Sequence, residues 1–194
     1  SQAVYWGAAR HEWHWVGFHD LGEPAGRCIC GAPIRYEFVL RNAHTGIDVA
    51  TGSACVQHFD TPMSQEALSA ADCFKELMQG NTSRRMNQAL REFAHREKLM
   101  TTADARYYAQ YGQSRPGTNR FIDARLSKIN LEFLAKQDPN RPKCRCDPTR
   151  FRNFEAELKK AKAGKLFYAC RRGRKGCDFF AWHHLQHVSL GLSR

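Results

Sequence analysis

Four of the eight cysteines lie close together near the carboxyl end of this 194-residue chain. They are arranged as Cys-x-Cys, a 23-residue spacer and Cys-x6-Cys, at Cys144, Cys146, Cys170 and Cys177. Thiolates at such spacing can converge on one tetrahedral Zn²⁺ ion. We therefore expect a metal-stabilised module in this segment.

The same segment carries nearly all of the net positive charge of the chain. Residues 141–194 contain 14 Lys or Arg and four Asp or Glu, which accounts for ten of the eleven net positive charges. Four thiolates around one Zn²⁺ leave a net charge of about −2 at the site, so the net charge of the segment is about +8 after metal loading. This asymmetry favours a polyanionic partner, with nucleic acid the first candidate.

A second group of possible ligands lies nearer the amino end. Cys28-x-Cys30 offers two sulfurs in a tight turn, and Cys55-x2-His58 follows after residues 34–41 and 47–50, which read as two strands of a hairpin. This order of turn, hairpin and helix start resembles a treble-clef zinc site in outline. We expect a second Zn²⁺ at Cys28, Cys30 and Cys55, with a structural role.

The fourth ligand of this amino-terminal site is left open by the sequence. His58 is favoured, because a helical turn places residues i and i+3 on one side. A folded-back arm carrying His11, His14 or His19 could also reach the site. Cys73 is a further candidate, although it lies beside an apolar helical stripe, where a buried cysteine acts as a small hydrophobic residue.

The remaining pattern predicts an α+β chain of three parts: a small zinc-stapled β-hairpin unit, a helical middle region and a carboxyl-terminal antiparallel-sheet finger on zinc. Residues 1–27 are aromatic and read as irregular. Helical periodicity runs from Thr61 to about Gln137, with breaks at Gly80 and at Pro116-Gly117. Residues 138–142 read as a linker, and 155–162 as a helical or looped insert. We expect domains at residues 1–137 and 138–194.

The carboxyl-terminal segment resembles a known family. Gly164-Lys165-Leu166-Phe167-Tyr168-Ala169-Cys170, followed by Cys177-Asp178-Phe179-Phe180-Ala181-Trp182, is similar to the GRF-type zinc finger over about residues 141–184. Lys165 stands where that family usually has arginine, and Cys144-x-Cys146 replaces a common Cys-x-His pair. The resemblance implies a curved antiparallel sheet on one zinc ion that binds single-stranded nucleic acid.

A single strand is held by cations along its backbone and by rings stacked on its bases. The same chemistry serves DNA and RNA. The module's own core is expected to take Phe167, Phe180 and some of the other rings. The candidate nucleic-acid contacts are Arg150, Arg152, Lys165, Tyr168, Arg171, Arg172, Arg174, Lys175, Phe179 and Trp182.

No catalytic constellation is found: a phosphate-cradling glycine loop and paired carboxylates are both missing, so we expect a binding protein rather than an enzyme. No leader and no membrane-spanning run is seen, and closely spaced cysteines indicate metal ligands in a reducing intracellular compartment. The leading function is zinc-dependent binding of single-stranded DNA or RNA. The alternative is an adaptor that docks a polymerase, helicase or repair enzyme from replication, repair or transcription.

Overall fold

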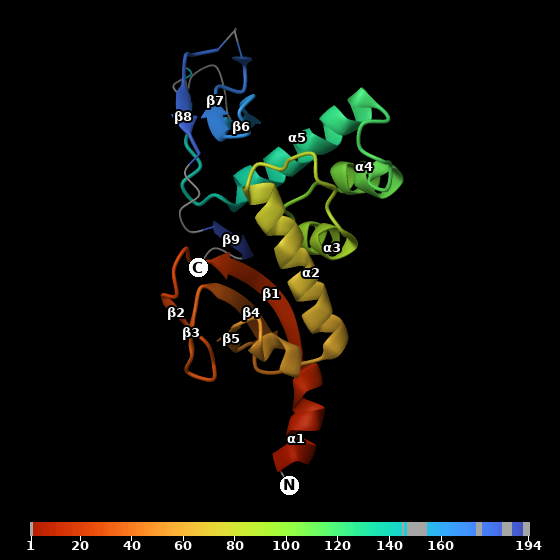
Figure 1. Ribbon diagram of the computed structural model, residues 1–194, viewed down its shortest axis with the longest axis vertical. Coiled ribbons are helices and arrows are strands. Elements are labelled where there is room, and N and C mark those ends of the chain that lie inside the picture. The colour runs from red at the N-terminus through yellow and green to blue at the C-terminus, as the bar shows by residue number, and fades with distance from the viewer. Residues whose placement is uncertain (1, 145, 147–154, 174–175, 184–187, 192–194) are drawn as a thin grey trace. The chain divides into compact units, whose positions relative to one another are not determined.

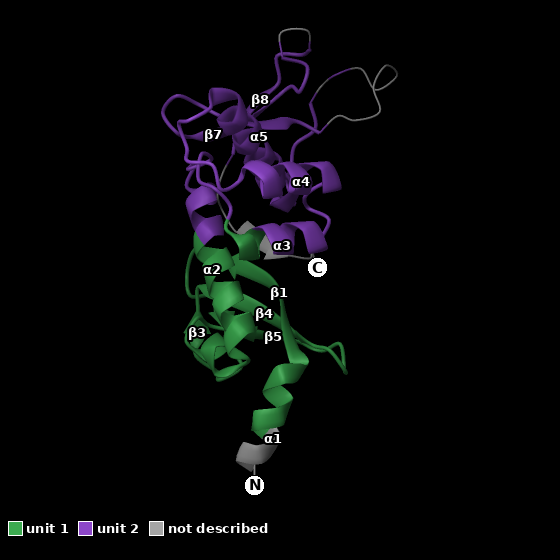
Figure 2. Cartoon of the chain, turned by 90° about the vertical axis from the view of Figure 1, so that its right-hand side faces the viewer, with its two compact units in different colours: residues 1–72, 87–90, 186–194 green, residues 73–86, 91–185 purple. Residues whose placement is uncertain are grey.

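The computed structural model describes residues 2–144, 146, 155–173, 176–183 and 188–191 (Figure 1). The chain is a mixed α+β protein with sheets at the amino end, a helical middle and a three-stranded antiparallel sheet near the carboxyl end. It divides into two compact units, which Figure 2 shows in different colours. Unit 1 comprises residues 1–72, 87–90 and 186–194, and unit 2 comprises residues 73–86 and 91–185.

Unit 1 is built on a four-stranded antiparallel sheet in the order β5-β4-β1-β9. Its core contains large apolar side chains, among them Trp15, Phe18, Phe38 and Leu40, each at most 2% exposed. The strands are β1 (Trp13–Asp20), β4 (Tyr36–Asn42), β5 (Asp48–Thr51) and β9 (Val188–Gly191), and β2 (Gly26–Arg27) pairs with β3 (Pro33–Ile34) in a separate ribbon. The hairpin expected from residues 34–41 and 47–50 is therefore confirmed as β4 and β5.

The aromatic residues 1–27 are not irregular, as the sequence suggested. They form α1 (Gln2–Ala9), a 3-10 turn η1 (Arg10–Glu12) and β1, which lies inside the sheet between β4 and β9. The register between β1 and β4 shifts between Trp15 and Gly17, and Trp15 to Phe18 are all buried. A bulge of this kind breaks the period-2 pattern by which a half-buried strand is recognised in a sequence.

The helical region is confirmed between residues 61 and 137. It contains α2 (Thr61–Met78), α3 (Gln88–Arg96), α4 (Thr102–Tyr111) and α5 (Arg120–Gln137), with the one-turn 3-10 helix η2 (Cys55–His58) preceding α2. Gly80 follows α2 at φ +86°, in the left-handed region that glycine adopts without strain. In unit 2, the hydroxyl of buried Tyr108 donates to Asn130 at 2.8 Å, and Asn130 donates to the carbonyls of Thr82 and Arg84.

The carboxyl-terminal sheet belongs to unit 2 and has the order β6-β7-β8. Its strands are β6 (Glu157–Lys160), β7 (Leu166–Ala169) and β8 (Phe180–Trp182). We call residues 141–183, as far as they are described, the finger. The lysine-rich residues 155–162 were expected to be helical or looped, but they contain β6, because Leu158 pairs with Tyr168 and needs an extended backbone to do so.

The expected linker at residues 138–142 makes specific contacts within unit 2. Arg141, whose side chain is only 8% exposed, pairs with Glu132 of α5 at 3.3 Å and donates to the carbonyl of Ala156 at 3.1 Å. These bonds tie the end of α5 to the finger. In the described part of the chain, no helix combines the length and the apolar character needed to cross a bilayer.

Candidate metal centres

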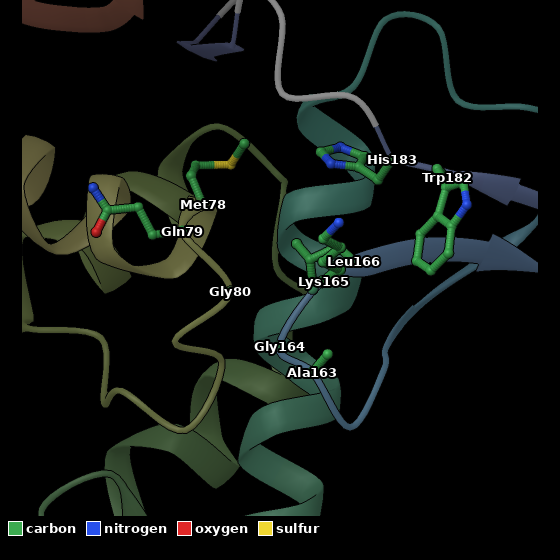
Figure 3. Close-up of a pocket in the computed structure, with 9 residues that line it drawn as sticks. All are labelled: Met78, Gln79, Gly80, Ala163, Gly164, Lys165, Leu166, Trp182 and His183. Atoms are coloured by element: carbon green, nitrogen blue, oxygen red, sulfur yellow. The ribbon is translucent and has the colours of Figure 1, made fainter.

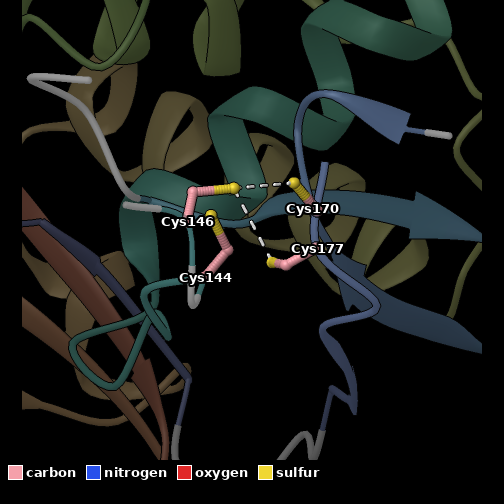
Figure 4. A group of neighbouring side chains, drawn as sticks. All are labelled: Cys144, Cys146, Cys170 and Cys177. Atoms are coloured by element: carbon pink, nitrogen blue, oxygen red, sulfur yellow. Dashed lines mark hydrogen bonds between the residues drawn. The ribbon is translucent and has the colours of Figure 1, made fainter. Parts of the chain in front are cut away.

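The four carboxyl-terminal cysteines converge on one point of the finger (Figure 4). Their sulfur atoms all lie within 4.8 Å of one another. The Cys146 sulfur is 3.4 Å from the Cys170 sulfur and 3.7 Å from the Cys177 sulfur. Sulfurs about 2.3 Å from a tetrahedral zinc would be about 3.8 Å apart. The cluster, which we call the four-cysteine centre, therefore has the size of a tetrahedral thiolate site for a metal ion.

Hydrogen bonds within this centre shift the pKa values of two of its thiols in opposite directions. Burial raises the pKa of Cys170, but hydrogen bonds from the Arg172 backbone and from the Cys146 and Cys177 groups outweigh it and lower the pKa to about 7. A backbone bond with Cys177 lowers the pKa of Cys146, but thiol bonds to Cys170 and Cys144 raise it to about 12. Hydrogen bonding within the centre thus favours the thiolate form of Cys170 and the protonated form of Cys146 until a cation is bound.

Three cysteines form a second cluster in unit 1, the three-cysteine centre. The sulfurs of Cys28, Cys30 and Cys55 lie within 4.8 Å of one another, with Cys28 buried and Cys30 exposed. Burial raises the pKa of Cys28, but hydrogen bonds from the Cys30 and Gly52 backbones lower it below its usual value. Thiol bonds with Cys28 and Cys30 raise the pKa of Cys55 to about 12. This centre too could hold a metal ion.

The two centres share one local turn. In each, a cysteine is followed three residues later by a glycine with positive φ, Gly31 at +89° and Gly173 at +56°. The amide of that glycine donates to the carbonyl of the cysteine, at 2.7 Å for Cys28 and 3.1 Å for Cys170. The turn directs backbone N–H groups toward the sulfur, which stabilises its thiolate form.

The fourth ligand expected in unit 1 is not found among the described side chains of the three-cysteine centre. His58 ends η2 with an exposed ring, outside the group of converging sulfurs. His11 is bonded to Asp60, and neither His14 nor His19 belongs to the group. Cys73 is buried in unit 2 and its sulfur lies 3.6 Å from the Arg85 carbonyl, the environment of a buried hydrophobic cysteine.

An aromatic face lies on the exposed side of the finger sheet. We use this name for Phe167, Phe180 and Trp182, whose ring centroids are 5.0 to 6.1 Å apart. Phe180 is 53% exposed and Trp182 is 48% exposed. Lys159 is directly opposite Phe167, which is opposite Trp182, so all three share this side of the sheet. These rings, of which Phe167 is half-buried, form an apolar patch, and Lys159 at its edge is 3.5 Å from the Glu157 carboxylate.

The rings are therefore distributed differently from the sequence expectation. Phe167 and Phe180 were assigned to the core, yet they lie on the aromatic face. Tyr168, expected to contact nucleic acid, is 2% exposed and donates to Asp138 at 2.7 Å. Side chains alternate along a strand, and Leu166, Tyr168 and Cys170 take the buried side of β7 and its continuation, which leaves Phe167 outside. That alternation was the signal that could have found Phe167.

The other expected contacts have mixed positions. Lys165 and Arg172 are exposed, and Phe179 is half-buried. Arg171 is exposed, but its guanidinium is 3.4 Å from the Glu132 carboxylate, which already pairs with Arg141. Arg150, Arg152, Arg174 and Lys175 lie outside the described residues.

Two features of the site follow from these positions. All eight cysteines are free of disulfides, and seven of them gather in the two centres. The aromatic face and the four-cysteine centre are parts of one finger within unit 2.

Comparison of the chain with protein-family models, curated proteins and solved structures finds no match.

Proposed function

We propose that this chain binds single-stranded nucleic acid through its carboxyl-terminal finger, with Zn²⁺ in the four-cysteine centre. The aromatic face is the observation that carries the proposal. Three neighbouring rings at the surface of a polar protein expose apolar area that water disfavours, and such a patch marks a binding surface. Bases supply flat faces for stacking on rings of this kind.

The charge of the finger supports the same ligand. Lys159 borders the aromatic face in the register, and Lys160, Lys162, Lys165 and Arg172 are exposed elsewhere in the finger. The phosphodiester backbone of a nucleic acid is attracted by this excess of cations, whereas an apolar protein partner would not need it. The resemblance to the GRF-type finger implies the same ligand, and a four-thiolate site of tetrahedral size fits the zinc of that family.

Zinc would act here as a structural ion. Four thiolates fill its coordination sphere, so no open position remains for water or substrate. We propose a second Zn²⁺ at the three-cysteine centre, where the fourth ligand expected at His58 stays a prediction. The loaded four-cysteine centre would hold the backbone that carries the aromatic face, and the finger would bind its ligand without catalysing a reaction.

Fluorescence polarisation of a labelled single strand with the zinc-loaded protein tests the proposal. Trp182→Ala and Phe180→Ala should each weaken binding by about 1–3 kcal/mol, because each removes one stacking ring. Phe121→Ala is the matched control, since Phe121 is a 72% exposed ring of α5 outside the finger, and it should leave the affinity unchanged. Affinity should also fall steeply with salt as phosphate contacts release counterions.

Two results would reject the proposal. One is the absence of binding to single-stranded DNA and RNA at low salt. The other is binding that Phe121→Ala weakens as much as Trp182→Ala. Under either result we would favour the adaptor function instead. A protein partner that the chain retains from lysate after nuclease digestion would support that function.

A further inference from the structure

A cleft of about 520 Å³ opens beside the aromatic face, within unit 2 (Figure 3). One side is the end of α2 with the turn that follows it, and the other is the β6–β7 turn with the end of β8. The lining residues are Met78, Gln79, Gly80, Ala163, Gly164, Lys165, Leu166, Trp182 and His183. Its volume falls in the range of about 300–1,000 Å³ that is usual for small-molecule sites.

Two backbones approach each other closely where the two sides of the cleft meet. A Cβ atom on Gly80 would lie 2.4 Å from the carbonyl oxygen of Gly164, closer than any side chain could come. Gly164 itself has a φ of +85° and donates its amide to Ala161 at 2.9 Å. The two turns therefore contact each other at Gly80 and Gly164, and the side chains around these glycines line the cleft.

The walls of the cleft combine one ring, aliphatic surface and one cation. Met78 on the α2 side and Leu166 on the β7 side are 8% and 5% exposed and form apolar walls, and Trp182 lines the cleft at the end of β8 (Figure 3). The His183 side chain, 4% exposed, is 3.6 Å from the Asp138 carboxylate and so is held in place. Lys165 brings the positive charge. A flat heterocycle that carries an anionic group fits this combination.

Trp182 connects this cleft to the aromatic face, because it belongs to both. We propose that the cleft binds one nucleotide of the bound strand, with its base against the indole of Trp182 and the apolar wall, and its phosphate near Lys165. The inference rests on the proposed function, and it goes further: it adds a cleft for a single base to a flat stacking surface.

Adenosine monophosphate, adenosine and ribose 5-phosphate are suitable probes, with binding to the zinc-loaded protein followed by NMR titration. Adenosine monophosphate should bind at about millimolar Kd and ribose 5-phosphate at least about tenfold more weakly, since it has no base to stack. Ala163→Leu should weaken adenosine monophosphate about tenfold by filling the cleft. Ala109→Leu makes the same change at an exposed position of α4 and should have no effect.

Lys165→Met separates the two halves of the ligand. It removes the charge and keeps an unbranched apolar side chain, so it should weaken adenosine monophosphate several-fold and leave adenosine unchanged. Equal binding of adenosine monophosphate and ribose 5-phosphate would overturn the inference. So would an Ala163→Leu variant that binds adenosine monophosphate like the unmodified protein.

Failure of this inference differs from failure of the proposed function. If a labelled strand binds and Trp182→Ala weakens it, but Ala163→Leu affects neither the strand nor the mononucleotide, the aromatic face stands and the cleft site falls. If no strand binds, the proposed function is rejected. The titrations with adenosine monophosphate and ribose 5-phosphate then show whether the cleft still binds a free nucleotide.

Discussion

The two cysteine centres contain the same turn, but they belong to units with very different hydrophobic cores. The four-cysteine centre serves a small three-stranded sheet whose described buried side chains are few, Leu158, Leu166 and Tyr168 chief among them. The three-cysteine centre belongs to a unit with a four-stranded sheet and a core of large aromatic and aliphatic residues. Metal should therefore be indispensable to the first sheet and supplementary to the second, because little apolar area is buried in the finger.

The number of thiolates differs as well. Four sulfurs can satisfy the whole coordination sphere of a zinc ion, whereas three leave a position for another ligand. The finger therefore combines a complete set of four thiolate ligands with the sheet that we expect to depend most on metal. This contrast can be tested centre by centre.

Loss of metal from the four-cysteine centre should have the largest effect. We expect Cys170→Ser to release about one zinc ion per chain and to unfold β6–β8, because structural zinc contributes about 10–16 kcal/mol in comparable small modules. Zinc quantification and hydrogen exchange of the β7 amides measure the two effects. Cys73→Ser is the matched control at a buried cysteine outside both centres, and it should keep its full zinc content. Persistent protection of β7 in metal-free Cys170→Ser would remove the contrast.

Loss of metal from the three-cysteine centre should have a smaller effect. Cys55→Ser should release one zinc ion and leave β1 and β4 protected from exchange, since Phe18, Phe38 and Leu40 stay buried without metal. His58→Ala tests the expected fourth ligand, whose ring is outside the cluster of sulfurs, and a change in zinc affinity of less than about threefold would exclude it. A loss as large as that of Cys55→Ser would instead establish His58 as the fourth ligand.

The smallest effect concerns a hydrogen bond of the finger that involves no metal ligand. Tyr168→Phe deletes a buried hydrogen bond to Asp138 and should lower the free energy of unfolding of zinc-loaded unit 2 by about 1–3 kcal/mol. Chemical denaturation in excess zinc measures it. Tyr111→Phe, at a half-buried ring of α4, is the control.

The same hydroxyl predicts a dependence on pH. Burial, together with the Asp138 carboxylate, raises the pKa of Tyr168 above its usual value. A raised pKa in the folded state means that its contribution is complete below the tyrosine pKa of the unfolded chain, about 10, and is lost as pH rises further. Tyr168→Phe should therefore flatten the decline in stability above about pH 10, whereas Tyr111→Phe should not.

Much of this organisation is visible in the sequence. Cysteine spacing identified seven thiolates that converge, because a cysteine followed by a glycine turn sets its sulfur geometry within a few residues. Helical periodicity from Thr61 to Gln137 and the hairpin of β4 and β5 were likewise set by local patterns. The strand β1 was missed because a bulge hides its alternation. The pairing of β9 with β1 was missed because it joins segments about 170 residues apart.

The sequence by itself determined the two cysteine groups, the charge asymmetry and the α+β class, since these depend on residue type and short spacing. The tertiary structure alone decided which rings face outward and which cations are already paired. Phe167 and Tyr168 are neighbours in sequence, yet one is on the aromatic face and the other is bonded to Asp138. The physical reason is that alternation places Phe167 and Tyr168 on opposite sides of β7, and what packs against the sheet, here α5 against the neighbouring strand β6, decides which side is buried.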